Sequence, residues 1–362
     1  MRILVDILHP HEVHVFRYAY EEWRKRGHEV ALTAREKDVA VELLQNMAIP
    51  HTVLSRVGKG LAGLGLELIQ RDWRLWRFCR EFKPDVFTGV SGISAAHVAW
   101  LMRKPCVVWD DTEHQIKAHQ ITYPVATIYE CPDCYYKPMG AKQYFYPGTQ
   151  ELAYLHPNRF TPDPDLVRSL GVDPDEAYCV IRLVSWGAHH DVGQHGIRDA
   201  VAFIKRIAQH ARPLITSETT LPEELEPYRM RAPVHLFHHV LAFARACVAE
   251  GSTVAAEACV LGTPSVYMNT LRLGYMNLLQ QYGLLEQTLD SDEALGHVLR
   301  WLTDDAHRAA CQRAREKLLN DKMDVTEHIV SVVEHAGRAG RAFRPEHAVA
   351  PHVENKPIVL DR

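Results

Sequence analysis

Residues 250–266 read Glu-Gly-Ser-Thr-Val-Ala-Ala-Glu-Ala-Cys-Val-Leu-Gly-Thr-Pro-Ser-Val, and this stretch decides the fold class. A short apolar run at 246–250 precedes a turn of small residues, and a helix-like segment at 253–261 ends in Gly-Thr-Pro before a second apolar run at 264–268. A strand, a helix and another strand in that order form a unit of a parallel sheet covered by helices. The stretch therefore predicts an α/β fold.

The same alternation of β-branched runs and helical periodicity fills both halves of the chain. We expect strands at residues 3–8, 29–33, 85–90, 105–109 and 125–129, and then at 178–184, 213–216, 246–250 and 264–268. We expect helices at residues 13–26, 37–46, 94–103, 197–210, 253–261, 291–303 and 306–319. The pattern predicts two parallel sheets, one in each half.

A proline-rich segment separates the halves. Residues 154–165 read Tyr-Leu-His-Pro-Asn-Arg-Phe-Thr-Pro-Asp-Pro-Asp, and prolines at this spacing forbid regular structure. We therefore expect a first domain at 1–155, a second at 165–340 and a tail at 341–362. Two Rossmann-like parallel-sheet domains of this kind would face a cleft, because open parallel sheets bind ligands beyond the carboxyl ends of their strands.

The composition is that of a soluble globular protein rather than a nucleic-acid-binding or membrane-spanning protein. The formal net charge is -4, which gives no reason to expect nucleic acid as a partner. No apolar run reaches the roughly 18 residues of a membrane-spanning helix, and the first ten residues are too short an apolar segment for a signal peptide. The eight cysteines are scattered, as is typical of reduced thiols in a cytoplasmic protein.

The turn at the start of the 253–261 helix predicts a phosphate site. Backbone N–H groups and the positive end of a helix favour an anion, and Glu250 and Gly251 lie beside this position. Ser252 and Thr253 add hydroxyl donors, and Glu257, one turn further on, offers a carboxylate for the two hydroxyls of a ribose. The alternative is a strand-to-helix turn capped by Ser or Thr.

The loop that follows the 178–184 strand predicts further substrate contacts. Arg182 and Ser185 are candidate phosphate ligands. His189, His190 and Asp191 are candidate substrate-binding groups, with a solvated polar loop as the alternative. Histidine and aspartate also bind metals, but no second cluster completes a metal-binding spacing, so we expect no metal.

The loop after the first strand carries three histidines, His9, His11 and His14. His14 is expected at the start of the following helix, where the helix dipole lowers the pKa of an imidazole and lets it act as a base near pH 7. We expect His9 and His11 to bind substrate. The alternative for His14 is a helix-start histidine exposed to water.

A group of carboxylates directly follows the expected strand at 105–109. Asp110, Asp111 and Glu113 are candidate catalytic groups, because neighbouring carboxylates exchange protons or bind sugar hydroxyls. Capping of the next helix is the alternative. Ser91 and Gly92 end the preceding strand and are expected to lie nearby as substrate-binding residues.

Residues 73–80, Trp-Arg-Leu-Trp-Arg-Phe-Cys-Arg, form an amphipathic basic stretch. A helix that faces the core with a solvated arginine face explains this pattern, and a membrane-surface role is the alternative. The pair Cys131 and Cys134 has no partner pair, so it predicts no zinc site. GxxxxGK[ST] and GxGxxG motifs are absent, which argues against P-loop and dinucleotide chemistry.

These residues together resemble the GT-B superfamily, whose second domain carries a Gly/Ser/Thr turn, a helix with an inward Glu and a Gly-x-Pro stop. Residues 251–264 match that layout. Residues 6–10 and 24–30 resemble one branch, a family of archaeal and bacterial predicted glycosyltransferases close to the non-hydrolysing UDP-N-acetylglucosamine 2-epimerases. Residues 151–160 and 188–191 are also typical of that branch, and the resemblance covers about residues 1–335.

The resemblance implies a metal-independent hexosyl or N-acetylhexosaminyl transferase with a UDP-type donor, a sugar or lipid-linked acceptor and no cofactor. It implies that Ser252 and Thr253 bind the diphosphate, Glu257 the ribose, and that His14 is the base. We expect such an enzyme to act in surface or exported polysaccharide assembly, and its C-terminal helical region to pack back on the first domain, as in other GT-B chains. Peripheral membrane association stays open from the amphipathic stretch at 73–80.

One departure weakens the link to the epimerases. They carry a His-Arg-Arg-Glu-type motif after the first strand of the second domain, where this chain has His-His-Asp-Val at 189–192. A sugar-nucleotide epimerase or hydrolase and a non-catalytic binding module remain the alternatives to transfer.

Overall fold

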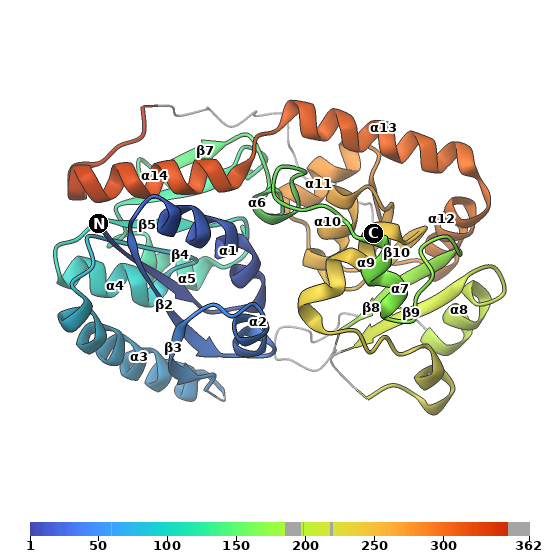
Figure 1. The fold of residues 1–362 in the computed structure, drawn as a ribbon, viewed down its shortest axis with the longest axis horizontal. Helices are drawn as coiled ribbons and strands as arrows, with labels where there is room; N and C mark the ends of the chain where they lie inside the picture. Colours follow the sequence, from blue (N-terminus) through green and yellow to red (C-terminus); the bar gives the residue numbers. More distant parts are fainter. Residues whose placement is uncertain (59, 185–196, 198, 218–219, 347–362) are drawn as a thin grey trace. The chain divides into compact units, whose positions relative to one another are not determined.

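The computed structural model describes residues 1–362 except 59, 185–196, 198, 218–219 and 347–362. The chain forms two compact units (Figure 1). Of the described residues, the first unit comprises Met1–Tyr154 and 323–346, and the second comprises Leu155–Lys322. Each unit contains one sheet in which every pairing is parallel, so the predicted α/β fold with two Rossmann-like domains is confirmed.

The first sheet has the strand order β3-β2-β1-β4-β5-β6-β7. The chain moves outward from β1 to β3, then returns to the other side of β1 with β4, so the strand order reverses between β1 and β4. In open parallel sheets, ligands bind at such a reversal. The strands are β1 (Arg2–Ile7), β2 (Glu29–Glu36), β3 (His51–Arg56), β4 (Val86–Val90), β5 (Cys106–Trp109), β6 (Ile128–Pro132) and β7 (Gln143–Tyr146).

Helices cover both faces of the first sheet, because successive side chains of a strand point to opposite faces. Val108 of β5 belongs to the core beneath α4, whereas the next residue, Trp109, contacts His328 of α14 edge to face. The helices of this unit are α1 (Pro10–Lys25), α2 (Ala40–Asn46), α3 (Gly60–Phe82), α4 (Ile93–Leu101), α5 (Ile116–Thr122), α6 (Leu152–Leu155) and α14 (Val325–Ala339).

Helix α14 joins the C-terminal part of the chain to the first unit. It packs against α1, β4 and β5 (Figure 1). The indole N–H of Trp23 donates to the carbonyl of Val330 at 3.5 Å, and Arg26 pairs with Glu327 at 2.8 Å. The second unit therefore ends at Lys322 rather than at residue 340, because the apolar face of α14 is buried on the first sheet.

The second sheet has the strand order β12-β11-β10-β8-β9 and reverses between β8 and β10. Apolar side chains of α8 and α12 form one core with β8 and β10. Its strands are β8 (Tyr178–Leu183), β9 (Arg212–Ser217), β10 (Ala246–Ala249), β11 (Ser265–Tyr267) and β12 (Leu285–Gln287). Its helices are α7 (Pro164–Ser169), α8 (Ala200–Ile207), α9 (Phe237–Phe243), α10 (Ser252–Leu261), α11 (Gly274–Gln281), α12 (Ser291–Thr303) and α13 (Asp305–Asp321).

The nine expected strands are present, and three further strands were not predicted. These three, β3, β7 and β12, all lie at the edge of a sheet. An edge strand buries fewer side chains, and β3 alternates only weakly between buried and exposed positions. All eight cysteines are buried free thiols, as their scatter through apolar runs predicted.

Candidate functional site

The start of α1 places a histidine at the carboxyl end of β1. His9 is the N-cap, and its imidazole accepts a hydrogen bond from the backbone N–H of His11 at 3.4 Å. Pro10 begins the helix, as suits the first helical position. The helix therefore starts earlier than expected, so His11 lies in its first turn and His14 in the second. The expected placement of His14 at the helix start was wrong.

His11 meets two buried carboxylates in what we call the first-unit cluster, made of His11, Asp111 and Glu151. One nitrogen or oxygen atom from each side chain lies within 4.8 Å of the other two. Asp111 follows β5, and Glu151 directly precedes α6. Nε2 of His11 is 3.0 Å from Oε1 of Gln150, and Nδ1 is 3.2 Å from the hydroxyl of Tyr154. These two contacts fix the plane of the imidazole.

Burial controls the protonation of the first-unit cluster. It raises the pKa of Glu151 to about 7, although the nearby His11 acts in the opposite direction. Burial also raises the pKa of Asp111, again opposed by His11. Among the described residues, Oε2 of Glu151 has no hydrogen-bond partner. Two close carboxylates in a low-dielectric site disfavour double ionisation, so the cluster can hold and release a proton near neutral pH.

Imidazole and carboxylate groups are also metal ligands, so this cluster has the donor atoms for a divalent cation. Both ring nitrogens of His11, however, already lie at hydrogen-bond distance from Gln150 and Tyr154. A metal would have to replace one of these contacts. A substrate hydroxyl would likewise replace one of them, so the cluster has the groups both for proton transfer and for metal binding.

The other predicted catalytic residues have different surroundings. Asp110 is buried, its Oδ2 is 2.7 Å from Nε2 of His119, and its Oδ1 accepts the backbone N–H of Thr112 at 2.8 Å. These contacts direct Asp110 toward α5. Glu113 is also buried, and its backbone carbonyl accepts from Lys137 at 3.3 Å.

His14 belongs to the same region as the first-unit cluster through Tyr154. Its ring stacks on that of Tyr154, with centroids 5.3 Å apart and an interplanar angle of 28°. The Tyr154 hydroxyl in turn contacts His11. His14 is buried, so the alternative of a water-exposed histidine is wrong. The stacked ring of His14 holds the ring of Tyr154 in place, and the hydroxyl of Tyr154 in turn orients the imidazole of His11.

Ser91 and Gly92 form the turn after β4, beside the reversal of the strand order. Both are left-handed, with φ of 54° and 43°. A left-handed backbone at a serine is strained and concentrates at functional turns. The Ser91 hydroxyl donates to Oε1 of Gln115 at 3.2 Å. The expected proximity of this turn to the end of β5 is borne out by the backbone N–H of Ser91, which donates to the carbonyl of Trp109 at 2.8 Å.

In the second unit, the predicted phosphate turn lies between β10 and α10. Gly251 is the N-cap of α10 with extended backbone, and no side chain caps the helix. The alternative of a turn capped by Ser252 or Thr253 is therefore not what the structure shows. A side chain added at Gly251 would meet only Val184, at 3.5 Å, among the described residues. The first N–H groups of α10 therefore receive no side-chain cap in the described chain, and uncapped helix N–H groups suit an anion.

Glu250 has a structural role in this unit. Its Oε2 accepts the backbone N–H of Val184 at 2.8 Å, and its Oε1 accepts that of Ile197 at 2.9 Å. The backbone N–H of Glu250 donates to the carbonyl of Arg182 at 3.1 Å. The buried carboxylate thus joins the ends of β8 and β10 and contributes to the site by positioning them.

Glu257 lies in the second turn of α10 and is buried. Its Oε1 is 2.9 Å from Nε2 of His238 on α9. The imidazole of His238 orients the carboxylate that the sequence assigned to ribose binding. No motif identified His238, because it comes from a different helix.

Some predicted residues fall outside the part of the chain that the structure describes: Ser185, His189, His190 and Asp191. Arg182, at the end of β8, is half-buried.

Sequence reasoning missed Glu151, Gln150 and Tyr154 as site residues. They lie together in the stretch 150–154, which carried a family resemblance but no recognisable catalytic spacing. A glutamate next to a run of buried apolar residues was the available signal. Its partners, His11 and Asp111, are distant in sequence, so only the fold brings the three together.

Comparison with solved structures finds the fold of this chain in glycosyltransferases and UDP-GlcNAc 2-epimerases. A UDP-GlcNAc 2-epimerase from Neisseria meningitidis, bound to UDP-GlcNAc, matches with a TM-score of 0.63 and 11% identity, covering 91% of this chain and 99% of that one. A glycosyltransferase from Streptomyces sp. SF2575, complexed with thymidine diphosphate, matches with a TM-score of 0.62 and 13% identity, covering 92% and 99%. At these identities the matches show the GT-B fold alone.

A third structure, S. aureus MnaA with UDP, matches with a TM-score of 0.62 and 9% identity, covering 92% of this chain and 96% of that one. No curated protein matches the chain. The family described as "Protein of unknown function (DUF354)" matches residues 1–335, and the chain belongs to this family.

Proposed function

We propose that the chain is a glycosyltransferase that moves a hexosyl or N-acetylhexosaminyl group from a UDP-type donor to a hydroxyl acceptor. The observation that carries the proposal is the first-unit cluster, in which His11 lies beside the buried carboxylate of Asp111 at the carboxyl edge of a parallel sheet. An imidazole next to a carboxylate is a competent general base, because the carboxylate stabilises the imidazolium that forms.

The reaction follows from this pairing. In the proposed step the acceptor hydroxyl replaces Gln150 or Tyr154 at one ring nitrogen of His11, and that nitrogen takes the hydroxyl proton while the hydroxyl oxygen forms a bond to the anomeric carbon of the sugar. The bond between that carbon and the diphosphate oxygen breaks, and the diphosphate leaves with the electron pair. Glu151, whose pKa is about 7, supplies a second proton-holding group beside His11. This role for His11 replaces the one expected for His14.

The donor side of the proposal rests on α10. The N–H groups at Gly251, Ser252 and Thr253 would bind the diphosphate, and Glu257, oriented by His238, would bind the ribose. The helix N-terminus would neutralise the leaving group, so the proposed reaction needs no metal ion or cofactor. The GT-B relatives crystallised with UDP, UDP-GlcNAc or thymidine diphosphate support a nucleotide-sugar donor.

The acceptor in this proposal is a sugar or a lipid-linked sugar, used in assembly of surface or exported polysaccharide on the cytoplasmic side. The family resemblance supports this assignment. Incubation of the purified chain with UDP-sugars and candidate acceptors, followed by mass spectrometry, tests it directly. We expect the activity to persist in EDTA. Loss of activity in EDTA would indicate that the first-unit cluster binds a metal ion.

The role of His11 is tested by His11→Ala. Turnover should fall by about 10²- to 10⁴-fold, the usual share of a general base, while donor affinity stays nearly unchanged. His335→Ala is the matched control, because His335 is exposed on α14. Equal turnover of His11→Ala and the control would remove His11 from the mechanism.

Epimerisation is the second candidate, and one observation favours it: the two carboxylates of the first-unit cluster have raised pKa values, as groups that exchange a proton with a sugar carbon require. Incubation with UDP-sugars in heavy water, without acceptor, separates the two. A transferase leaves carbon 2 of the sugar unlabelled, whereas an epimerase that abstracts a proton introduces deuterium. Deuterium incorporation that depends on Asp111 or Glu151 would replace transfer by epimerisation.

A further inference from the structure

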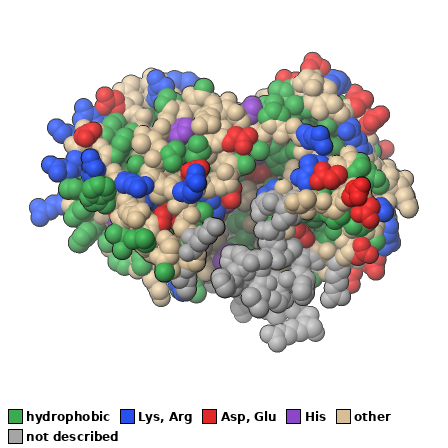
Figure 2. All heavy atoms as spheres, turned by 90° about the horizontal axis from the view of Figure 1, so that it is seen from below, with side chains coloured by type: hydrophobic (Ala, Val, Ile, Leu, Met, Phe, Trp, Pro, Cys, Tyr) green, Lys and Arg blue, Asp and Glu red, His purple; other side chains and the backbone are tan. Residues whose placement is uncertain are grey.

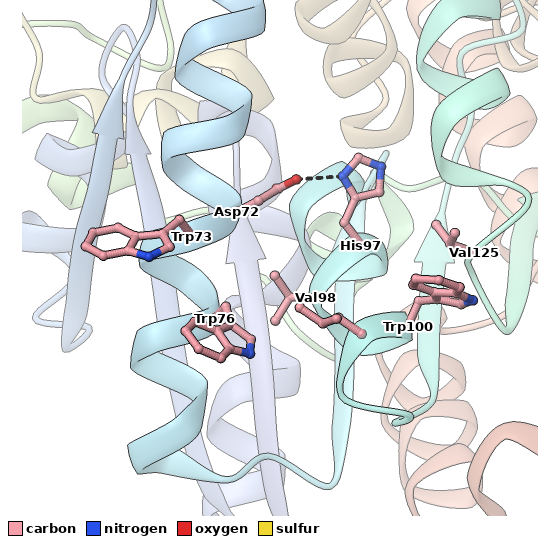
Figure 3. Close-up of a pocket in the computed structure, with 8 residues that line it drawn as sticks. Asp72, Trp73, Trp76, His97, Val98, Trp100 and Val125 are labelled. Carbon is pink, nitrogen blue, oxygen red and sulfur yellow. Dashed lines mark hydrogen bonds and ion pairs between the residues drawn. The ribbon is translucent and has the colours of Figure 1, made fainter.

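Helices α3 and α4 enclose an apolar groove of about 520 Å³ on the first unit. Figure 3 shows Trp73 and Trp76 projecting from α3, and His97 and Trp100 from α4. Its only charged or ionisable lining residues are Asp72 and His97, which pair with each other at 2.8 Å. Its remaining walls are formed by large apolar side chains: Trp73, Trp76, Val98, Trp100, Leu101 and Val125.

The groove belongs to a larger apolar surface, which we call the tryptophan face: Leu66, Ile69, Trp73, Trp100 and Leu101, each more than half exposed. Leu66, Ile69 and Trp73 follow the spacing of one face of a helix. Of the eleven large hydrophobic residues exposed in the described chain, only Leu289 lies outside residues 53–121. Trp73, Trp100 and Leu101 of this face line the same groove, and an exposed apolar patch of this kind marks a surface that binds another apolar body.

Basic side chains border the tryptophan face. The guanidinium of Arg77 lies 4.9 Å from the ring centre of Trp73, and that of Arg80 lies 5.1 Å from the ring centre of Trp76. Arg103, just after α4, is also exposed. The half of Figure 2 that contains α3 shows hydrophobic side chains gathered beside Lys and Arg.

The acidic groups near this face are few or already paired. Asp72 pairs with His97, and Glu67 pairs with Arg35 on the buried side of α3. Asp85 pairs with Lys104 at 3.6 Å. On α3 only Glu81 remains as an exposed acid against the exposed Arg74, Arg77 and Arg80. The surface therefore combines apolar side chains with net positive charge.

We propose that the tryptophan face docks on an anionic lipid bilayer. Tryptophan prefers the boundary between headgroups and acyl chains, and arginine binds lipid phosphates at the same depth. Leu66, Ile69 and Leu101 insert beside the indoles. No described helix has the length and apolar character to cross a bilayer, so the contact is peripheral. This inference does not depend on the proposed glycosyl transfer.

The test uses the full chain in a sedimentation assay with two kinds of vesicle, phosphatidylcholine alone and an equal mixture of phosphatidylcholine and phosphatidylglycerol. We expect binding to the anionic vesicles that is about tenfold or more tighter than to the neutral ones and that weakens with salt. The double variant Trp73→Ser/Trp100→Ser should lose about tenfold or more in affinity. Arg77→Gln/Arg80→Gln should lose binding to anionic vesicles specifically.

Leu289→Ser is the matched control, because Leu289 is exposed on the second unit and should leave vesicle binding unchanged. Unaltered thermal unfolding and UDP affinity of the tryptophan variants would separate a docking defect from misfolding or loss of the donor site. Equal sedimentation of wild type and the tryptophan variant would overturn the proposal. A wild-type dimer that becomes monomeric in that variant, without vesicle binding, would also overturn it and identify a contact between copies.

Discussion

Replacement of Glu151 by glutamine should make the stability of the protein less sensitive to pH. Glu151 is buried, and burial raises its pKa from 4.5 to about 7. The folded protein therefore holds this proton more tightly than the unfolded chain does. It follows that the free energy of unfolding decreases as the pH rises from about 4.5 to about 7, and that the full loss is present above pH 7.

The size of the effect follows from the pKa difference. Each pKa unit corresponds to about 1.36 kcal/mol, so ionised Glu151 destabilises the folded state by roughly 3 kcal/mol above pH 7. At pH 5 most of this destabilisation is absent. Glutamine has nearly the same shape and no charge, so Glu151→Gln removes the pH-dependent part. The stability of the variant relative to wild type should therefore increase by about 2–3 kcal/mol between pH 5 and pH 8.

Urea unfolding of both proteins at pH 5 and pH 8 measures this difference, and any constant effect of the substitution cancels between the two pH values. Glu42→Gln, on the exposed side of α2, is the control and should show no such change. The effect should also shrink in an Asp111→Asn background, because the charge of Asp111 contributes to the raised pKa of Glu151. A relative stability that is the same at both pH values would refute the assigned environment of Glu151.

Substitutions at four further residues test other contacts. Arg71→Met should destabilise the first unit by about 3–5 kcal/mol, because it leaves the buried carboxylate of Asp6 without its ion-pair partner, and Asp6→Asn in the same chain should restore part of the loss in a urea titration. Glu257→Ala should weaken UDP binding by about 1.5–3 kcal/mol in calorimetry, and unchanged affinity would exclude Glu257 from the donor site. His238→Ala should weaken it by a smaller amount, about 1 kcal/mol, since His238 acts through Glu257. Glu250→Gln should speed amide hydrogen exchange at Val184 and Ile197, whose backbone N–H groups donate hydrogen bonds to Glu250. Unchanged exchange at these two residues would contradict the role of Glu250 as a link between β8 and β10.

Central strands and their helices could be predicted because their signal is local. Each buried strand is a short β-branched run, and a turn such as Gly262-Thr-Pro, with Gly262 left-handed at φ of 90°, ends a helix visibly in the sequence. Three of the four edge strands, β3, β7 and β12, could not be predicted in the same way. The packing of α14 on the first unit was expected from the family resemblance, not from its own pattern. Amphipathic periodicity shows that a helix has a buried face, but not which sheet buries it.

The candidate site was predictable only in part for a related reason. The turn at Gly251 and the carboxylate Asp111 follow strands, so the position of each at a sheet edge could be inferred. Arg71 shows the opposite case, because no local pattern marked it, whereas the structure buries it beside Asp6. Glu151 acquires its raised pKa from burial and from neighbours distant in sequence, which no local pattern encodes.

The placement of α14 has a consequence for synthesis of the protein. The second unit is one continuous segment, Leu155–Lys322, whereas the first unit is made of two segments separated by it. The ribosome therefore finishes the second unit before it makes α14, and until then one face of β4 and β5 lacks its cover. During translation the second unit can therefore complete its fold before the first. Until α14 is made, the first unit exposes apolar surface, as is typical of chains that depend on chaperones. Chains that end at residue 322 should therefore aggregate, which sedimentation of the truncated and the full chain after expression would measure.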